Sequence, residues 1–286
     1  MKVSGFTFLR NAHINGYPFV ESIKSLLPIV DEMICVIGQG DDATKETVMS
    51  IGDAKIRIID SMWNESMRDR GFVYGQQKMI AQYNCSGDWA VYLEADEILH
   101  EDDLDTIQTT MKANLDDLEV EALYFDFLHF YGIPSQIGIA GYRKAPRIIR
   151  NSIRSIAPDG LFWIILEKNK KGRYPKAKYA GAKIYHYGHC RKIEKMSNKL
   201  KQVGKYWSSE HDTFSTYGRI DPAELRPFRG SHPQVIAEWL KNEAEQVFEL
   251  DPTFKLTMRN FRNRLRFWIE EKYGVEISKK HFHDLG

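Results

Sequence analysis

The chain has 286 residues, of which 43% are hydrophobic and 28% are charged, with a formal net charge of +1. This composition excludes a disordered or low-complexity protein and suits one large α/β domain, with or without an appendage. No run approaches the roughly 18 apolar residues of a membrane span, and the first residues predict a strand rather than a signal peptide. We therefore expect a cytoplasmic protein, whose three cysteines are reduced: Cys35, Cys85 and Cys190.

The small net charge conceals a strong asymmetry along the chain. Residues 1–141 carry a formal charge of −13, residues 142–205 carry +15 and residues 206–286 carry −1. This pattern predicts a metal-binding side that faces an anion-binding side. The alternative is that the two oppositely charged parts attract each other across the fold.

Strands and helices alternate over the first hundred residues. This alternation predicts βαβ units, and hence a mostly parallel sheet with helices on both faces. Ligands on such sheets bind beyond the carboxyl ends of the strands, where loops here carry Arg10, Asn11, Asp41, Asp42 and Asp60. The expected strands are 3–9, 33–37, 55–59 and 89–93, a turn is expected at 38–42, and the helices are 17–27, 44–51 and 70–83.

The remainder of the chain is less regular. After a helix over 101–115, a mixed or antiparallel arrangement is expected, followed by a helical segment. We therefore expect a catalytic domain over 1–190, with halves 1–105 and 106–190, and a C-terminal helical extension over 191–286. The further strands are 122–131, 146–150, 161–166 and 182–187, and the further helices are 193–207, 233–248 and 257–273.

A cluster of carboxylates ends the fourth predicted strand, at Glu94-Ala95-Asp96-Glu97. Carboxylates placed there repel one another unless a cation offsets their charge. Alternation along the chain puts Glu94 and Asp96 on the same side, as a site for a hard cation requires. Such a cation stabilises a departing diphosphate. The alternative is a solvated acidic loop that caps the following helix.

The first hundred residues resemble family 2 glycosyltransferases of the GT-A fold, particularly bacterial enzymes that build lipopolysaccharide cores or capsules. Such proteins have Arg-Asn after the first strand, a Glu-Ser helix, a Pro-Ile-Val-Asp-Glu stretch, an Asp-rich turn, and a Gly-Asp-Trp strand before an Asp-X-Asp-Glu signature. The resemblance covers residues 1–105 well and the rest loosely. The counterparts are Arg10-Asn11, Glu21-Ser22, Pro28 to Glu32, Gly38 to Thr44 with Asp41-Asp42, Gly87-Asp88-Trp89, and Glu94 to Glu97.

The resemblance implies an inverting transfer from a UDP- or GDP-linked sugar to a glycan or lipid-linked acceptor. It implies that Glu94, Ala95 and Asp96 lie at the donor, that Asp60 contacts the nucleobase and that Lys78 touches the diphosphate. A strand-end cap is the alternative for Asp60, and an ordinary surface charge for Lys78. Two departures weaken the match, because Gly38 replaces the usual aspartate at the end of the second strand and Glu94 replaces the first Asp of the signature.

A histidine late in a GT-A domain often completes the metal shell, and Ile184-Tyr185-His186-Tyr187-Gly188-His189 ends a strand in the basic segment. By this resemblance, His186 is the expected ligand and His189 the alternative. An imidazole with two carboxylates suits Mn²⁺ or Mg²⁺. A structural histidine at a strand end is the other interpretation.

An inverting transfer needs a general base near the acceptor hydroxyl. Residues 142–205 contain only three acidic residues, and Asp159 and Glu167 are the candidates. Asp159 is favoured because a Pro-Asp-Gly turn can project its carboxylate into a cleft. The same turn chemistry supplies the structural alternative.

The helix expected over 257–273 has an apolar face, with Met258, Phe261, Leu265, Trp268 and Ile269, and four arginines elsewhere. This pattern is typical of a helix that lies on an anionic membrane, or of a core helix with a solvated face. Two other functions remain open, a nucleotidyltransferase and a degenerate GT-A binding protein. Nucleic-acid binding is not expected, because the rest of the chain is acidic.

Overall fold

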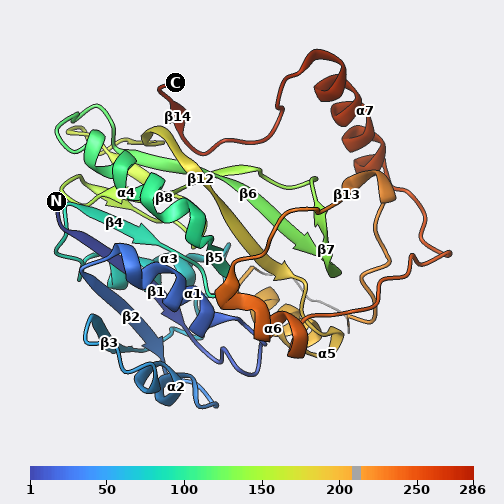
Figure 1. Ribbon diagram of the computed structural model, residues 1–286, viewed down its shortest axis with the longest axis horizontal. Coiled ribbons are helices and arrows are strands. Elements are labelled where there is room, and N and C mark those ends of the chain that lie inside the picture. The colour runs from blue at the N-terminus through green and yellow to red at the C-terminus, as the bar shows by residue number, and fades with distance from the viewer. Residues whose placement is uncertain (208–213) are drawn as a thin grey trace.

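The computed structural model describes residues 1–207 and 214–286. Over these residues an eleven-stranded mixed sheet carries helices on both faces (Figure 1). Three short strands form a second, separate sheet. The predicted α/β class, with a large central sheet covered by helices, is confirmed.

Four neighbouring strands form the parallel half of the sheet, in the spatial order β3-β2-β1-β4. The chain runs outward from the first strand to the third and then crosses back to place the fourth on the other side. At such a reversal the loops leaving the two central strands diverge and open a crevice. The strands are β1 (Val3–Leu9), β2 (Glu32–Gly38), β3 (Ile56–Ser61) and β4 (Trp89–Tyr92).

Both faces of this parallel half are buried. On β2, Met33 and Cys35 join one apolar cluster, whereas Ile34 and Val36 join the other. Helices α1 and α4 cover the first face and α3 covers the second (Figure 1), which explains the continuous apolar run of this strand. The helices are α1 (Phe19–Leu26), η1 (Leu27–Ile29), α2 (Thr44–Ser50), α3 (Phe72–Gln82), η2 (Glu101–Asp103) and α4 (Leu104–Ala113).

The second half of the sheet is mixed, as predicted. Its long strand β12 pairs with β5 on one side and β6 on the other, so that His186 lies opposite both Glu97 and His129. The strands are β5 (Glu97–Leu99), β6 (Ala122–Tyr131), β7 (Ile133–Gly138), β8 (Lys144–Arg150) and β12 (Lys176–His189), with β9 (Ser155–Ile156), β10 (Ile164–Leu166) and β11 (Gly172–Arg173) in the small sheet.

The segment 191–286 is only partly helical. It adds β13 to the edge of the main sheet beside β7, and β14 beside β12. Its elements are α5 (Ile193–Gly204), η3 (Lys205–Trp207), η4 (Pro222–Glu224), β13 (Leu225–Pro227), η5 (Gln234–Ile236), α6 (Ala237–Asn242), α7 (Met258–Tyr273) and β14 (His283–Asp284).

The single helix predicted over 233–248 is wrong in its second half, because α6 ends at Asn242. Beyond it, Ala244 forms a β-bridge with Arg191, and the amide of Glu245 donates to the carbonyl of Cys190 at 3.1 Å. These backbone groups are paired with the residues that follow β12, so they are not available to continue the helix.

The three cysteines are free and buried. Burial raises the pKa of each thiol to about 12, so these thiols are unreactive and pack as small apolar groups. None of the helices in 1–207 and 214–286 is long and apolar enough to cross a bilayer.

Candidate active site

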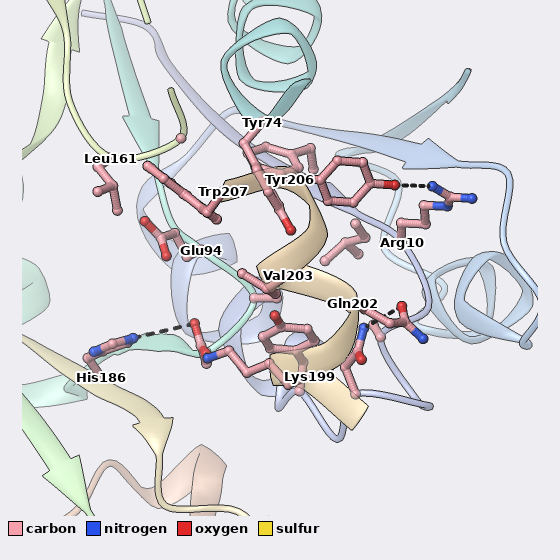
Figure 2. Close-up of a pocket in the computed structure, with 18 of the residues that line it drawn as sticks. Arg10, Tyr74, Glu94, Leu161, His186, Lys199, Gln202, Val203, Tyr206 and Trp207 are labelled. Carbon is pink, nitrogen blue, oxygen red and sulfur yellow. Dashed lines mark hydrogen bonds and ion pairs between the residues drawn. The ribbon is translucent and has the colours of Figure 1, made fainter. Parts of the chain in front are cut away.

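A cavity of about 300 Å³ lies beyond the carboxyl ends of β1 and β4, at the reversal of strand order. Helix α5 and the residues after it up to 207 form part of the wall of this cavity (Figure 2). Flat aromatic rings, which suit the stacking of planar ligands, line much of this cavity beside its polar groups. These rings belong to Phe8, Tyr17, Trp63, Tyr74, Tyr92, Tyr142, Tyr206 and Trp207.

Three candidate metal ligands meet in this cavity. Glu94, Asp96 and His186 each present one ligand atom, and these atoms lie within 4.8 Å of one another. The Nε2 atom of His186 is 3.6 Å from Oδ1 of Asp96. Two carboxylates and an imidazole form a donor set that fits Mn²⁺ or Mg²⁺. His189 is exposed at the end of β12, stacks its ring on Tyr131 and does not line this cavity.

Asp96 is held by two cations that the sequence did not connect with it. Its Oδ2 accepts hydrogen bonds from Arg191 at 2.7 Å and from Lys199 at 3.0 Å. Burial opposes ionisation of this carboxyl, but Lys199, His186 and Arg191 together hold its pKa well below the ordinary value. Asp96 is therefore ionised, and its other oxygen faces His186.

Glu97 does not line the cavity and forms a buried, bidentate ion pair with Arg147. The Nε and Nη2 atoms of Arg147 lie 2.7 and 2.6 Å from the Glu97 oxygens, and Nη2 is also 3.2 Å from Glu94. Burial, and then the charge of Glu97, raise the pKa of Glu94 to about 7, and Arg147 offsets only part of this effect. A cation bound beside Glu94 would favour its ionised form.

His129 is a further residue of this site, and no sequence motif pointed to it. It lies on β6 directly across from His186, with the two Nδ1 atoms 2.7 Å apart. Its Nε2 is 2.6 Å from the carbonyl oxygen of Tyr142. Burial, and then the neighbouring His186, lower the pKa of His129 to about 3, so its ring is neutral at physiological pH.

The predicted donor-binding residues are divided between two hollows. Arg10 and Ala95 line the same cavity as the three ligands. Asn11, Asp42 and Asp60 line a second hollow of about 440 Å³, beyond β2 and β3. The carboxylate of Asp60 forms an exposed ion pair with Lys45 at 2.7 Å.

Asn11 joins the loops after β1 and β2. Its Oδ1 accepts a hydrogen bond from the amide of Asp41 at 2.7 Å, and its Nδ2 is 3.4 Å from the Asp41 carboxylate. Its backbone is left-handed, with φ at 52°, a conformation that asparagine tolerates better than most residues. The contacts between Asn11 and Asp41 therefore hold these two loops together at the rim of the second hollow.

Lys78 is fully buried, so its interpretation as an ordinary surface charge is wrong. Its ammonium donates to the carbonyl of Gly160 at 3.1 Å and lies 3.8 and 4.1 Å from the ring centres of Trp163 and Tyr92. Burial, and then the charge of Arg147, lower its pKa well below the ordinary value. Lys78 supports the loop at 160 from beneath and does not line the cavity.

The two candidate bases differ in their place relative to the cavity. Asp159 directly precedes Gly160 and Leu161, which line the cavity, and its Oδ1 accepts from the amide of Leu161 at 2.8 Å. That hydrogen bond is the turn interaction expected if Asp159 has a structural role. Glu167 follows β10 in the small sheet, where its half-exposed carboxylate pairs with Arg173 at 3.2 Å.

Gly38 leaves space for an aromatic side chain. A Cβ atom at this position would lie 2.3 Å from Nε1 of Trp63. An aspartate could not occupy the end of β2 unless Trp63 moved. The indole Nε1 of Trp63 is buried and has no hydrogen-bond partner among the described residues, although its ring lines the cavity, and an unpaired buried donor is costly.

The end of α5 is fastened to the loop before α3. The amide of Gly71 donates to the carbonyl of Tyr206 at 2.8 Å, and the hydroxyl of Tyr206 is 3.0 Å from both oxygens of Glu65. Glu65 also pairs with Arg10 and with Lys205. Within this network Arg10 and Tyr206 line the cavity, and Nη1 of Arg10 donates to the Tyr206 hydroxyl at 2.9 Å (Figure 2).

A scan against protein-family models found no match, and a search of curated proteins found none either. Among solved structures, S. aureus TarS is similar over 53% of this chain, with 15% identity, a TM-score of 0.36 and 29% of the TarS chain covered. Structures of TarS 1–349 with UDP and with UDP-GlcNAc are similar over the same share, with identities of 13% and 15% and TM-scores of 0.37. This chain spans 47% and 46% of the length of those two proteins.

Proposed function

We propose that this protein is a glycosyltransferase that moves a sugar from a nucleoside diphosphate donor to a hydroxyl of a glycan or lipid-linked acceptor. The observation that carries the proposal is the meeting of Glu94, Asp96 and His186 in an aromatic cavity at the strand-order reversal. The resemblance of residues 1–105 to GT-A enzymes of family 2 agrees with this placement. By the same resemblance, we propose that the transfer serves cell-surface polysaccharide synthesis.

In this proposal Glu94, Asp96 and His186 hold Mn²⁺ or Mg²⁺. The cation would supply positive charge to the diphosphate as the bond to the sugar breaks. Lys199 lies at the same carboxylate and also lines the cavity, so its ammonium is placed to contact a phosphate oxygen. Arg10 also lines the cavity, on the side nearest the second hollow.

The chemistry that remains is activation of the acceptor hydroxyl. Asp159 is the proposed general base, because its Oδ1 is engaged in the turn while Oδ2 has no hydrogen bond among the described residues. The loop it begins, Gly160 and Leu161, forms part of the cavity wall. The base would accept the hydroxyl proton as the oxygen attacks the anomeric carbon and the nucleoside diphosphate departs.

Calorimetric titration of UDP and of GDP, each with and without Mn²⁺, tests the donor and the metal together. The expected result is metal-dependent binding of one nucleotide, lost in His186→Phe and retained in His189→Phe. This pair is preferable to Asp96→Ala, which would leave Arg191 and Lys199 buried without their carboxylate. Absence of binding by both nucleotides, with or without metal, would contradict the proposal.

A product assay separates transfer from the alternative functions. A glycosyltransferase releases the nucleoside diphosphate from its sugar donor, whereas a nucleotidyltransferase that uses a nucleoside triphosphate and a sugar phosphate releases pyrophosphate. A binding protein that has lost catalysis would bind the donor and release neither product. We expect release of the nucleoside diphosphate, dependent on both metal and acceptor.

A further inference from the structure

Helix α7 packs against the rest of the protein through its polar face. The side-chain amides of Asn260 and Asn263 donate to one oxygen of Glu224 at 3.0 and 2.7 Å. The guanidinium of Arg264 makes a bidentate contact with Asp221, at 2.7 and 2.8 Å. One helix face is thus fixed by charged and amide groups, with Phe267 as its buried apolar residue.

The apolar face of the same helix points outward. Met258, Phe261, Leu265 and Trp268 are 72%, 52%, 59% and 53% exposed. Their spacing places them on one stripe, about 15 Å long at 1.5 Å per residue. The core-helix interpretation of this segment is therefore wrong for these four side chains. A helix at a protein surface ordinarily exposes its polar face to solvent and buries its apolar face.

Cations accompany this stripe. Arg259 and Arg262 are exposed and form no ion pair among the described residues, and the ammonium of Lys272 lies 4.7 Å from the ring centre of Trp268. Residues 258–273 carry five Lys and Arg against two Glu, a formal charge of +3. One of the two acids, Glu270, is already paired with Arg143.

We propose that the outward face of α7 docks on an anionic lipid surface. An interfacial helix combines Trp, Phe and Leu on one side with Lys and Arg beside them, and each cation adds attraction to acidic headgroups. The ion pairs and amide contacts of the inner face fix the rotation of the helix so that the apolar stripe faces away from the protein. In Figure 1 the helix lies at the outer edge of the molecule, far from β2 and β3.

A second copy of the chain is a poorer occupant of this surface. Pairing two copies of α7 would bring their Arg259, Arg262 and Lys272 side chains together. Of the two acids on each helix, Glu271 is the one without an ion pair among residues 1–207 and 214–286, and it alone could offset this repulsion. A bilayer with acidic headgroups buries the same apolar side chains and attracts the same cations.

The docked helix is connected to the candidate active site through one short segment. Glu270 is paired with Arg143, and Arg266 donates to the carbonyl of Ala140 at 3.0 Å. The neighbouring Tyr142 lines the cavity. If the proposed function holds, docking would present the cavity to an acceptor anchored in the same membrane, but the docking itself does not depend on sugar transfer.

Co-sedimentation of the full chain with vesicles tests the docking. We expect association with equimolar phosphatidylglycerol and phosphatidylcholine vesicles, and little with phosphatidylcholine alone. The double variant Phe261→Ser, Trp268→Ser should lower the partition coefficient by about tenfold or more, because two apolar side chains no longer insert. The double variant Arg259→Gln, Arg262→Gln should lower association with the anionic vesicles by about tenfold.

Leu118→Ser provides the matched control, since Leu118 is 75% exposed and lies in a loop after α4. It should leave association unchanged, and thermal unfolding should show that all these surface variants remain folded. The proposal is overturned if wild type ignores the anionic vesicles, or if the Phe261 and Trp268 substitutions leave association intact. A dimer in sedimentation equilibrium that these same substitutions dissociate would also overturn it, in favour of a second copy.

Discussion

The Nδ1 atoms of His129 and His186 lie 2.7 Å apart, so one ring must donate a proton to the other. The Nε2 of His129 faces the carbonyl oxygen of Tyr142, which can only accept, so this nitrogen carries the proton of the neutral ring. Nδ1 of His129 is then the acceptor and Nδ1 of His186 the donor. In the neutral form of His186, this leaves a lone pair on Nε2, the atom that faces Asp96.

His129 is therefore a positioning residue for the proposed metal ligand, and His129→Phe should release His186 from this tautomer. The metal affinity should fall by about 10- to 100-fold, as it does when an outer partner of a ligating histidine is removed. Long-range ¹H–¹⁵N NMR of the metal-free protein reads the tautomer directly. His129→Gln is the matched control, because its amide can accept from His186 and donate to Tyr142. A His186 ring protonated on Nε2 in the wild type would contradict the assignment.

Lys199 should affect metal and nucleotide in opposite directions. Lys199→Met removes a cation 3.0 Å from Asp96, so Mn²⁺ should bind more tightly when no nucleotide is present. The same change should weaken nucleotide binding, because an ammonium at the proposed diphosphate site is lost. Calorimetry with each ligand measures both effects. Lys195→Met, on the same helix, is the control, and equal behaviour of the two variants would argue against this role.

The two candidate bases are separated by a pair of isosteric substitutions. Asp159→Asn keeps the oxygen that accepts from Leu161 but cannot take a proton, so turnover should fall by about 100-fold or more with little change in donor affinity. Glu167→Gln, in the half-exposed hairpin, should leave turnover nearly unchanged. Steady-state transfer rates with saturating donor provide the measurement, and unfolding curves confirm equal stability. Loss of activity in Glu167→Gln alone would reverse the assignment.

The buried ion pair of Arg147 with Glu97 should stabilise the fold strongly against removal of one partner. Arg147→Met leaves Glu97 uncompensated in a fully buried position, and we expect a loss of about 3–5 kcal/mol in the free energy of unfolding. The double variant Arg147→Met, Glu97→Gln should recover part of this loss, because no buried charge remains at that pair. Urea denaturation of both variants measures the difference, and equal losses would mean that the charge is not the cause.

The network around Glu65 should weaken at low pH. Burial opposes ionisation of Glu65, but hydrogen bonds from Arg10, Lys205 and Tyr206, together with the charge of Arg10, lower its pKa to about 2. A lowered pKa in the folded state means that the stabilisation is complete above the ordinary value of about 4.5 and disappears as the pH falls toward 2. Because the carboxylate is 44% exposed, the effect should stay within about 1 kcal/mol.

The comparison of wild type with Glu65→Gln over this pH range measures that contribution. The difference in the free energy of unfolding should be constant from neutral pH to about 5 and should shrink below it. A difference that grew on acidification would show that the ionised carboxylate does not stabilise this network.

Local patterns in the sequence were sufficient for the parallel half of the fold. The apolar runs of β2 and β4 indicated strands buried on both faces, and alternation correctly placed Glu94 and Asp96 on one side of the chain. The expected His186 also reached those two carboxylates. These features depend on residue spacing and on the rule that ligand sites lie at the carboxyl ends of parallel strands, both of which can be read along the chain.

Only the tertiary structure decided how the charges pair. The acidic and basic parts of the chain do attract each other, through Arg147 with Glu97 and Arg191 with Asp96. Such pairing depends on which strands become neighbours, so sequence distance carries no signal of it, and the same holds for His129 across from His186.

The direction that α7 faces was likewise open in the sequence, because amphipathicity defines two faces without assigning one to the protein. Its orientation is set by Asp221 and Glu224, which bind its polar side, and neither residue belongs to the helix itself.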